Sequence, residues 1–136
     1  MRRLADRDEL TIYRAFPDLE TAEMVVIHEQ TRKVLGVQVK TIGVDSRHPQ
    51  GTVDIDLASF RSSATTWIVV VAWDRDEATF RSECLVIPSL EVDGIVPPYR
   101  GHLRFPCTPH SGRPGRLDPY RRPLDKLGSI VAKLTV

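Results

Sequence analysis

Hydrophobic and polar residues alternate over several short stretches of the chain, and this two-residue period predicts β-strands. Such strands are predicted over residues 10–16, 22–27, 34–42, 52–57, 66–73 and 79–87. Residues 28–33 are polar and predict a hairpin turn, so the second and third strands should be antiparallel. The stretch from Trp67 to Trp73 is apolar throughout, which is typical of a central strand buried on both faces.

Helices are expected to be few. Residues 1–9 and 88–92 suit short helices, whereas residues 94–123 contain seven prolines and predict a long irregular connection with one strand, His102–Phe105. From Pro123 to Leu134 the apolar residues recur at helical spacing, which predicts an amphipathic helix packed on the sheet. The pattern as a whole indicates an α+β domain.

The composition is typical of a globular domain and does not indicate a function. A chain of 136 residues, 41% hydrophobic and 27% charged, is long enough for one domain with a core. The longest apolar run is too short to cross a bilayer, and the charged N-terminus lacks the apolar core of a signal peptide. Cys84 and Cys107 form no metal-binding spacing, so we expect a cytoplasmic protein with reduced thiols and no membrane partner.

The stretch Val37–Lys40 carries the most specific chemistry. Alternation places Gln38 and Lys40 on one face of a strand and the two valines on the other, in a core. Glu23 precedes Gln38 by fifteen residues on the neighbouring strand, and a turn near residues 29–33 would set it roughly opposite Lys40. A carboxylate, an amide oxygen and an ammonium would then converge, and hard cations such as Mg²⁺ prefer oxygen ligands.

These residues lie within TAEMVVIHEQTRKVLGVQVKTIG, from Thr21 to Gly43, followed later by TTWIVVVAWDRDEATFRSECLVIPS. The pattern, over roughly residues 10–92, resembles the restriction-endonuclease-like PD-(D/E)xK nucleases, most of all small bacterial members with glutamine in the final triplet. The resemblance implies a restriction endonuclease-like core, a mixed central sheet flanked by a few helices. It also implies a metal-dependent endonuclease that hydrolyses DNA, with Mg²⁺ or Mn²⁺ bound by Glu23 and Gln38 and the attacking water positioned by Lys40.

The same resemblance implies a setting and partners. It suggests bacterial defence or DNA processing, with DNA as the substrate and a homodimer as the working form, because cutting both strands requires two sites. A larger defence or repair assembly is a further expected partner. Residues 1–136 would form a single nuclease-like domain whose N-terminal helix is truncated, because residues 1–9 are too few for the family's opening helix.

Alternatives remain open at each position. Asp18 is a second candidate for the upstream acid, and Glu23 departs from the family's usual aspartate. Gln38 and Lys40 also suit the solvent side of an edge strand. Together these departures favour an alternative function, a catalytically degenerate nuclease-fold module that binds DNA or protein. An unrelated α+β domain with an accidental QVK is the third interpretation.

A local excess of arginine occurs between residues 99 and 122, where Asp118 is the only acid. Arginines in an exposed loop suit phosphate contacts, with a solvated loop or a dimer contact as the alternative. Asp54 and Asp56 are predicted on the solvent face of a strand, and the four histidines are predicted at the surface. The arginines predicted to bind nucleic acid are Arg100, Arg104, Arg113, Arg116, Arg121 and Arg122.

Overall fold

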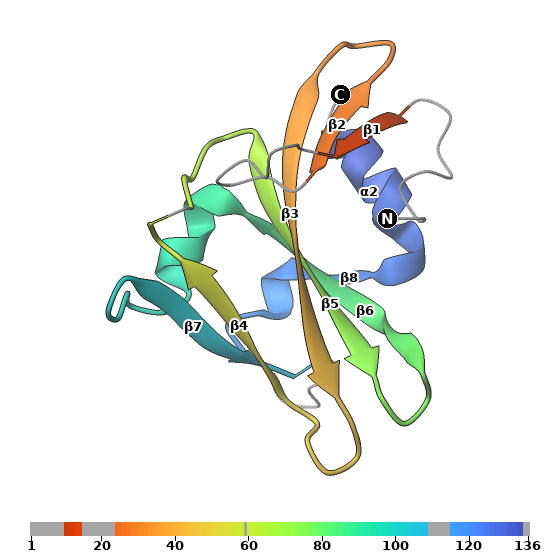
Figure 1. Ribbon diagram of the computed structural model, residues 1–136. Coiled ribbons are helices and arrows are strands. Elements are labelled where there is room, and N and C mark those ends of the chain that lie inside the picture. Colours follow the sequence, from red (N-terminus) through yellow and green to blue (C-terminus); the bar gives the residue numbers. More distant parts are fainter. Residues whose placement is uncertain (1–9, 15–23, 59, 109–114, 135–136) are drawn as a thin grey trace.

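The computed structural model describes residues 10–14, 24–58, 60–108 and 115–134, which form a mixed α+β fold dominated by strands (Figure 1). Six strands form one sheet in the order β1-β2-β3-β5-β6-β8, and β4 and β7 form a separate two-stranded ribbon. The strands are β1 (Leu10–Arg14), β2 (Met24–His28), β3 (Val34–Val44), β4 (Gly51–Asp56), β5 (Thr66–Asp74), β6 (Thr79–Pro88), β7 (His102–Cys107) and β8 (Arg121–Pro123). The helices are the 3₁₀ turns η1 (Ser89–Gly94), η2 (Asp118–Tyr120) and η3 (Leu124–Lys126), and the α-helix α2 (Leu127–Leu134).

The six-stranded sheet is mixed. Strands β1, β2 and β3 form an antiparallel meander, β5 runs parallel to β3, and β6 and β8 continue the sheet antiparallel. Strand β5 lies between β3 and β6, and its residues Ile68–Ala72 are all buried. The prediction of a central strand from the apolar run is therefore confirmed.

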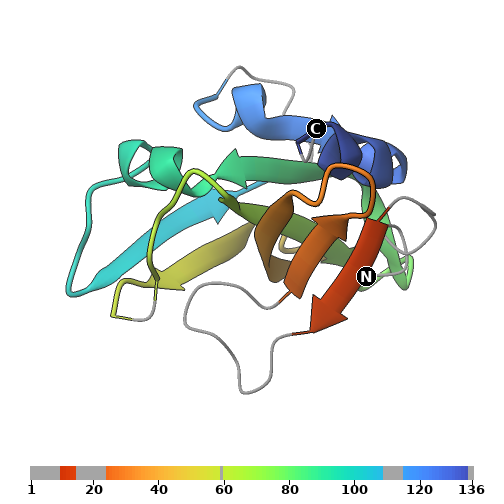
Figure 2. The ribbon, with the colours of Figure 1, turned by 90° about the horizontal axis from the view of Figure 1, so that it is seen from above.

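Alternation along β3 and β5 divides the core into two clusters on opposite faces of the sheet. Ile68 and Val70 belong to one cluster, which the ribbon covers with Val53, Ile55 and Leu103. We call this side the ribbon face. The opposite side, the helix face, carries Val37, Val69 and Val71 beneath the helix residues Leu127 and Val131. Figure 2 shows α2 and the ribbon on opposite sides of the sheet.

The ribbon crosses close to β3 at Gly51. A Cβ atom at this position would lie 2.7 Å from Cβ of Ile42, a distance that side chains do not tolerate. Glycine is therefore required where β4 begins, because the backbone must approach β3 closely before β4 turns onto the ribbon face. This contact fixes how the ribbon sits over the core.

Several local predictions require correction. The region expected to be irregular contains β8 and η2, and the strand predicted over His102–Phe105 extends to Cys107 and pairs with β4. His28, predicted at the surface, is buried, and its Nδ1 accepts a hydrogen bond from the Thr31 backbone N–H at 3.2 Å. The C-terminal helix is a 3₁₀ turn followed by α2 from Leu127. The helix predicted for residues 1–9 lies outside the described residues.

None of the helices in the described part of the chain has the length and the apolar character needed to cross a membrane.

Candidate functional site

Gln38 and Lys40 lie side by side on the ribbon face of β3. They share the alternation of Ile42 and Val44, and both are half-buried. Their Cα partners on β5 are Ile68 and Val70 respectively, which belong to the ribbon-face core. Because β3 lies inside the sheet between β2 and β5, the alternative of an edge strand is wrong.

One polar atom of this pair is not satisfied by the part of the chain that the structure describes. Oε1 of Gln38 is buried and has no hydrogen-bond partner there. Nor does any described residue form an ion pair with Lys40. A buried polar atom without a partner costs free energy, about 1–3 kcal/mol, so such atoms are rare unless a ligand or water completes them.

The predicted acidic ligand Glu23, and its alternative Asp18, lie outside the described residues. The β2–β3 ladder is described as far as the pair of Met24 and Val37. In the sequence, Glu23 comes just before Met24 and Gln38 just after Val37. The sequence suggested that Glu23 pairs with Lys40. The described register of β2 and β3 differs from that pairing by two residues.

Metal sites in proteins commonly consist of clustered histidine, cysteine, aspartate and glutamate side chains. No group of three or more His, Cys, Asp or Glu side chains with metal-binding geometry occurs in residues 10–14, 24–58, 60–108 and 115–134. The cation predicted to bind the Gln38 amide oxygen and Glu23 remains a prediction. Mg²⁺ keeps several waters, so two protein oxygens are enough for it.

The arginines predicted to bind nucleic acid divide between two places. Arg104 lies in β7 of the ribbon, and Arg100 lies just before β7. Arg121 and Arg122 lie in β8, at the far edge of the six-stranded sheet. Arg113 is outside the described residues. The sequence cluster therefore does not become a single basic surface within the described residues.

Most of these guanidinium groups make intramolecular contacts. Nε of Arg104 donates to Asp54 at 2.9 Å, and Nε of Arg121 donates to Asp118 at 3.1 Å. Arg116 donates to the carbonyl of Ile95, and Arg122 donates to the carbonyls of Pro119 and Arg121. These contacts lie within the chain, and the role of the arginines in binding nucleic acid remains a prediction.

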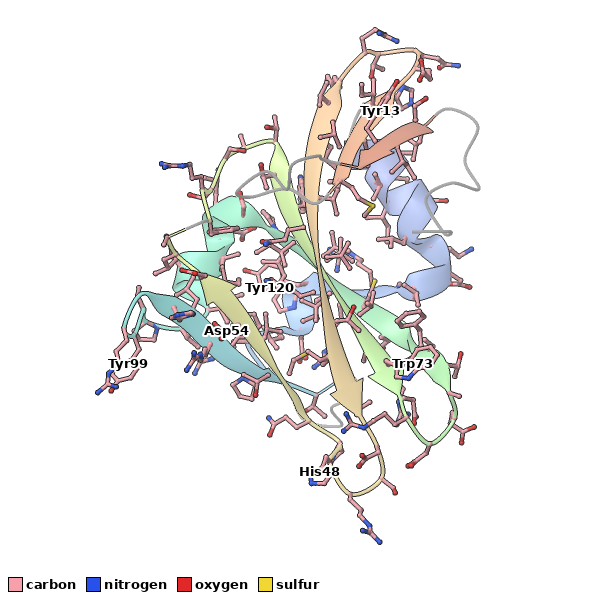
Figure 3. The ribbon with its side chains drawn as sticks, viewed as in Figure 1. Tyr13, His48, Asp54, Trp73, Tyr99 and Tyr120 are labelled. Atoms are coloured by element: carbon pink, nitrogen blue, oxygen red, sulfur yellow. The ribbon has the colours of Figure 1, made fainter. Side chains whose placement is uncertain are left out.

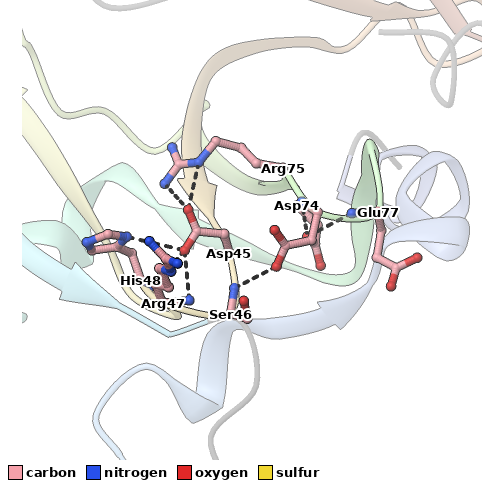
Figure 4. Close-up of polar contacts among 8 residues, drawn as sticks. Asp45, Ser46, Arg47, His48, Asp74, Arg75 and Glu77 are labelled. Atoms are coloured by element: carbon pink, nitrogen blue, oxygen red, sulfur yellow. Dashed lines mark hydrogen bonds and ion pairs between the residues drawn. The ribbon is translucent and has the colours of Figure 1, made fainter.

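A polar network that the sequence did not suggest joins the turn after β3 to the β5–β6 hairpin (Figure 4). Asp45 accepts hydrogen bonds from the backbone N–H groups of His48 at 2.6 Å and Arg47 at 2.9 Å, and it pairs with Nη2 of Arg75 at 3.1 Å. The His48 backbone bond is the main reason that the pKa of Asp45 is lowered. Arg75 reaches Asp45 across Gly43, where a Cβ would lie close against Nη1 of Arg75.

Asp74 completes this network at the end of β5. Its buried carboxylate accepts hydrogen bonds from the backbone N–H groups of Asp76 at 2.9 Å and Glu77 at 3.2 Å. Nη2 of Arg81 pairs with it at 2.9 Å. The carboxylates of Asp45 and Asp74 are thus satisfied by the protein itself, and the network fixes the two turns rather than offering free ligands.

A third polar group lies on the outer face of the ribbon, where Figure 3 labels Asp54. Nδ1 of His102 lies 2.8 Å from Oδ1 of Asp54, and Arg104 occupies the other carboxylate oxygen. Desolvation raises the pKa of Asp54, but the hydrogen bonds from His102 and Arg104 outweigh it, so the pKa is lowered. His102 was predicted at the surface and is partly exposed there, but its pairing with Asp54 on a strand far away in the sequence was not predicted.

Two cavities lie away from Gln38 and Lys40. One, of about 300 Å³, lies between β7 and η2 and is lined in part by Phe105, Leu117 and Arg121. The other, of about 480 Å³, lies between β6 and η3 and is lined in part by Phe80 and Leu124. The second cavity is also lined by Arg81, Glu83 and Asp125.

Comparison with known proteins found no protein-family model, no curated protein and no solved structure that matches this chain. Among the described residues, two buried side-chain atoms have no hydrogen-bond partner, Oε1 of Gln38 on β3 and Nε of Arg81 on β6. Gln38 is the one that lies beside a lysine, Lys40, on the same face of an interior strand.

Proposed function

We propose that this protein is a metal-dependent endonuclease that hydrolyses DNA phosphodiester bonds at a site formed by Glu23, Gln38 and Lys40. One observation carries the proposal. The buried amide oxygen of Gln38 has no partner among the described residues, and it lies two residues from Lys40 on the same face of an interior strand. A bound cation and a phosphate would satisfy both groups.

The ligand chemistry of the site suits a hard divalent cation. The amide oxygen of Gln38 is a neutral oxygen donor, and a carboxylate from Glu23 would add one negative charge. A continuation of the β2–β3 register by one residue would bring these two positions together. When bound, Mg²⁺ or Mn²⁺ would neutralise charge that develops on the phosphate oxygens.

Lys40 would act next to this cation. Its ammonium can donate hydrogen bonds to a phosphate oxygen and to the attacking water, which orients both for in-line attack. The neighbouring side chains on β5, Ile68 and Val70, are buried and apolar. An apolar wall lowers the local dielectric constant and strengthens the attraction between Lys40 and the phosphate.

The wider proposal follows from this chemistry. Double-strand cleavage needs two active sites, so we expect a homodimer acting on DNA, in bacterial defence or DNA processing and within a larger assembly where one exists. The alternative is a degenerate module that binds DNA or protein without cleaving it. Gln38 favours this alternative, because a neutral amide binds a cation more weakly than the carboxylate it replaces in the family pattern.

Cleavage assays with a lysine variant test the proposal. We would incubate the protein with plasmid and single-stranded DNA in Mg²⁺ and Mn²⁺, with EDTA as the metal-free control. Lys40→Ala should lower the cleavage rate by about 10²-fold or more, as expected when a group that stabilises transition-state charge is removed. Lys33→Ala, which removes an exposed lysine in the turn before β3, should cleave like the wild type.

Two results would contradict the nuclease. One is the absence of metal-dependent cleavage by the wild type on every substrate form. The other is cleavage that survives unchanged in Lys40→Ala, which would point to a contaminating enzyme. DNA binding without cleavage would support the degenerate module instead.

A further inference from the structure

The chain enters β7 through a tight turn whose backbone is unusual for its sequence. The backbone N–H of Tyr99 donates to the carbonyl of His102 at 2.9 Å, and the N–H of His102 donates to the carbonyl of Tyr99 at 3.0 Å. The two residues between them, Arg100 and Gly101, have φ angles of 50° and 78°. Such turns favour asparagine or glycine at both positions, because a side chain at positive φ crowds the backbone.

Arg100 keeps this strained conformation and stacks on its neighbour. Its guanidinium carbon lies 5.2 Å from the centroid of the Tyr99 ring, within the range of a cation–π contact. The Tyr99 side chain is nevertheless 70% exposed, the highest exposure among the large hydrophobic residues described. Figure 3 shows Tyr99 at the outer end of the ribbon, away from the core. Strained backbone conformations cluster at ligand-binding sites.

We propose that the Tyr99–Arg100 turn binds DNA that contains unpaired bases, with Tyr99 stacking on a base and Arg100 binding the adjacent phosphate. The choice of DNA rests on the proposed function above. Every base offers a π-face to an aromatic ring, and a guanidinium both stacks and pairs with phosphate. The preferred substrates would then be single-stranded, frayed or branched DNA rather than uninterrupted duplex.

The charges around the turn leave Arg100 available for a phosphate. Arg104, two strand positions beyond His102, is countered by Asp54 at 2.9 Å. Arg100 has no carboxylate partner among the described residues. The turn therefore presents one uncompensated guanidinium already held against an aromatic ring, which reduces the entropy lost on binding.

The position of the ribbon connects this turn with the proposed cleavage site. The inner ribbon residues Ile55 and Leu103 pack in the same cluster as Ile68 and Val70, the β5 neighbours of Gln38 and Lys40. The ribbon and the pair Gln38–Lys40 thus lie on the same face of the sheet.

Binding measured in EDTA tests the turn separately from cleavage. We would titrate short labelled single strands and duplexes by fluorescence anisotropy, and a strand containing 2-aminopurine by base fluorescence. Tyr99→Ala should weaken binding of the single strand by about 10-fold, which matches the loss of one stacked base. Tyr99→Phe should keep both the affinity and the 2-aminopurine quenching. Arg100→Ala should weaken binding and reduce its salt dependence by about one phosphate contact.

Controls and outcomes separate this inference from the nuclease proposal. Tyr13→Ala removes another exposed tyrosine, on β1, and should bind like the wild type. If Tyr99→Ala binds and quenches like the wild type, the turn is not a stacking site, whether or not the protein cleaves DNA. If Tyr99-dependent binding occurs without cleavage by the wild type, the inference stands and the nuclease fails. If no DNA binds, the inference is wrong.

Discussion

The amide oxygen of Gln38 is buried on the ribbon face and has no hydrogen-bond partner among the described residues. Replacing the amide by an apolar group of similar size removes the unsatisfied atom. Gln38→Leu should therefore raise the free energy of unfolding, by about 1 kcal/mol, while metal-dependent cleavage is lost. Urea unfolding followed by circular dichroism, with cleavage assays on the same preparation, measures both effects.

Gln30→Leu is the matched control for this experiment, because Gln30 is exposed in the turn between β2 and β3. It should change the unfolding free energy by less than about 0.5 kcal/mol. A Gln38→Leu protein that is clearly less stable than the wild type would show that Gln38 is satisfied in solution by other groups. The argument for an open ligand position would then fail.

Alternation alone predicted which residues of Val37–Lys40 share a face, because side-chain direction in a strand is a local property. It did not predict that the amide oxygen of Gln38 is buried without a partner, because that depends on what packs above β3. His28 shows the same limit. Its polar ring suggested the surface, yet a hydrogen bond from Thr31 allows the ring to be buried.

Among the elements, the ribbon is held on its outer face by the contacts of Asp54 with His102 and Arg104. Desolvation raises the pKa of Asp54, but the two hydrogen bonds outweigh it and lower the pKa below its usual value. A carboxylate whose pKa is lower in the folded state stabilises the fold above its unfolded pKa, and this stability is lost as the pH falls through the folded pKa. For an aspartate this window lies below about pH 4.

We expect Asp54→Asn to lower the thermal midpoint at pH 6 and to remove part of the acid dependence. The difference in midpoint between the wild type and Asp54→Asn should shrink as the pH is lowered from 6 toward 2. Asp93→Asn, which changes an exposed aspartate in η1, should show no such trend. A midpoint difference for Asp54→Asn that stays constant over this pH range would show that the charge of Asp54 does not hold the ribbon.

The strands themselves were largely predictable, but their long-range pairing was not. The six predicted stretches correspond to β1 through β6, because each carries its own alternation or apolar run. Pairing of β4 with β7 joins Asp54 to Arg104 across 50 residues, and no local pattern encodes it. Strand β8 has only three residues and ends in a proline, so tertiary contact with β6 decides its conformation. The sequence also does not predict the positive φ of Arg100 in the Tyr99–Arg100 turn.

For the whole molecule, the two core clusters share their central strands and each contains one cysteine. Cys107 belongs to the ribbon-face cluster and Cys84 to the helix-face cluster, and both thiols are buried. Burial raises the pKa of Cys84 to about 11 and also raises the pKa of Cys107. At pH 8 a thiol with such a pKa is ionised in about one molecule in a thousand, so it reacts with disulfide reagents very slowly.

Because β3, β5 and β6 supply residues to both faces, opening either cluster should require loss of the common sheet. The single-thiol variants Cys84→Ala and Cys107→Ala should therefore react with Ellman's reagent at pH 8 at the same slow rate, set by global unfolding, and both should react at once in urea. A remaining thiol that reacts much faster in one variant would show that its cluster opens locally. If the faster thiol were Cys107, the ribbon would separate from the sheet without unfolding it, and the turn proposed to bind DNA would belong to a mobile arm.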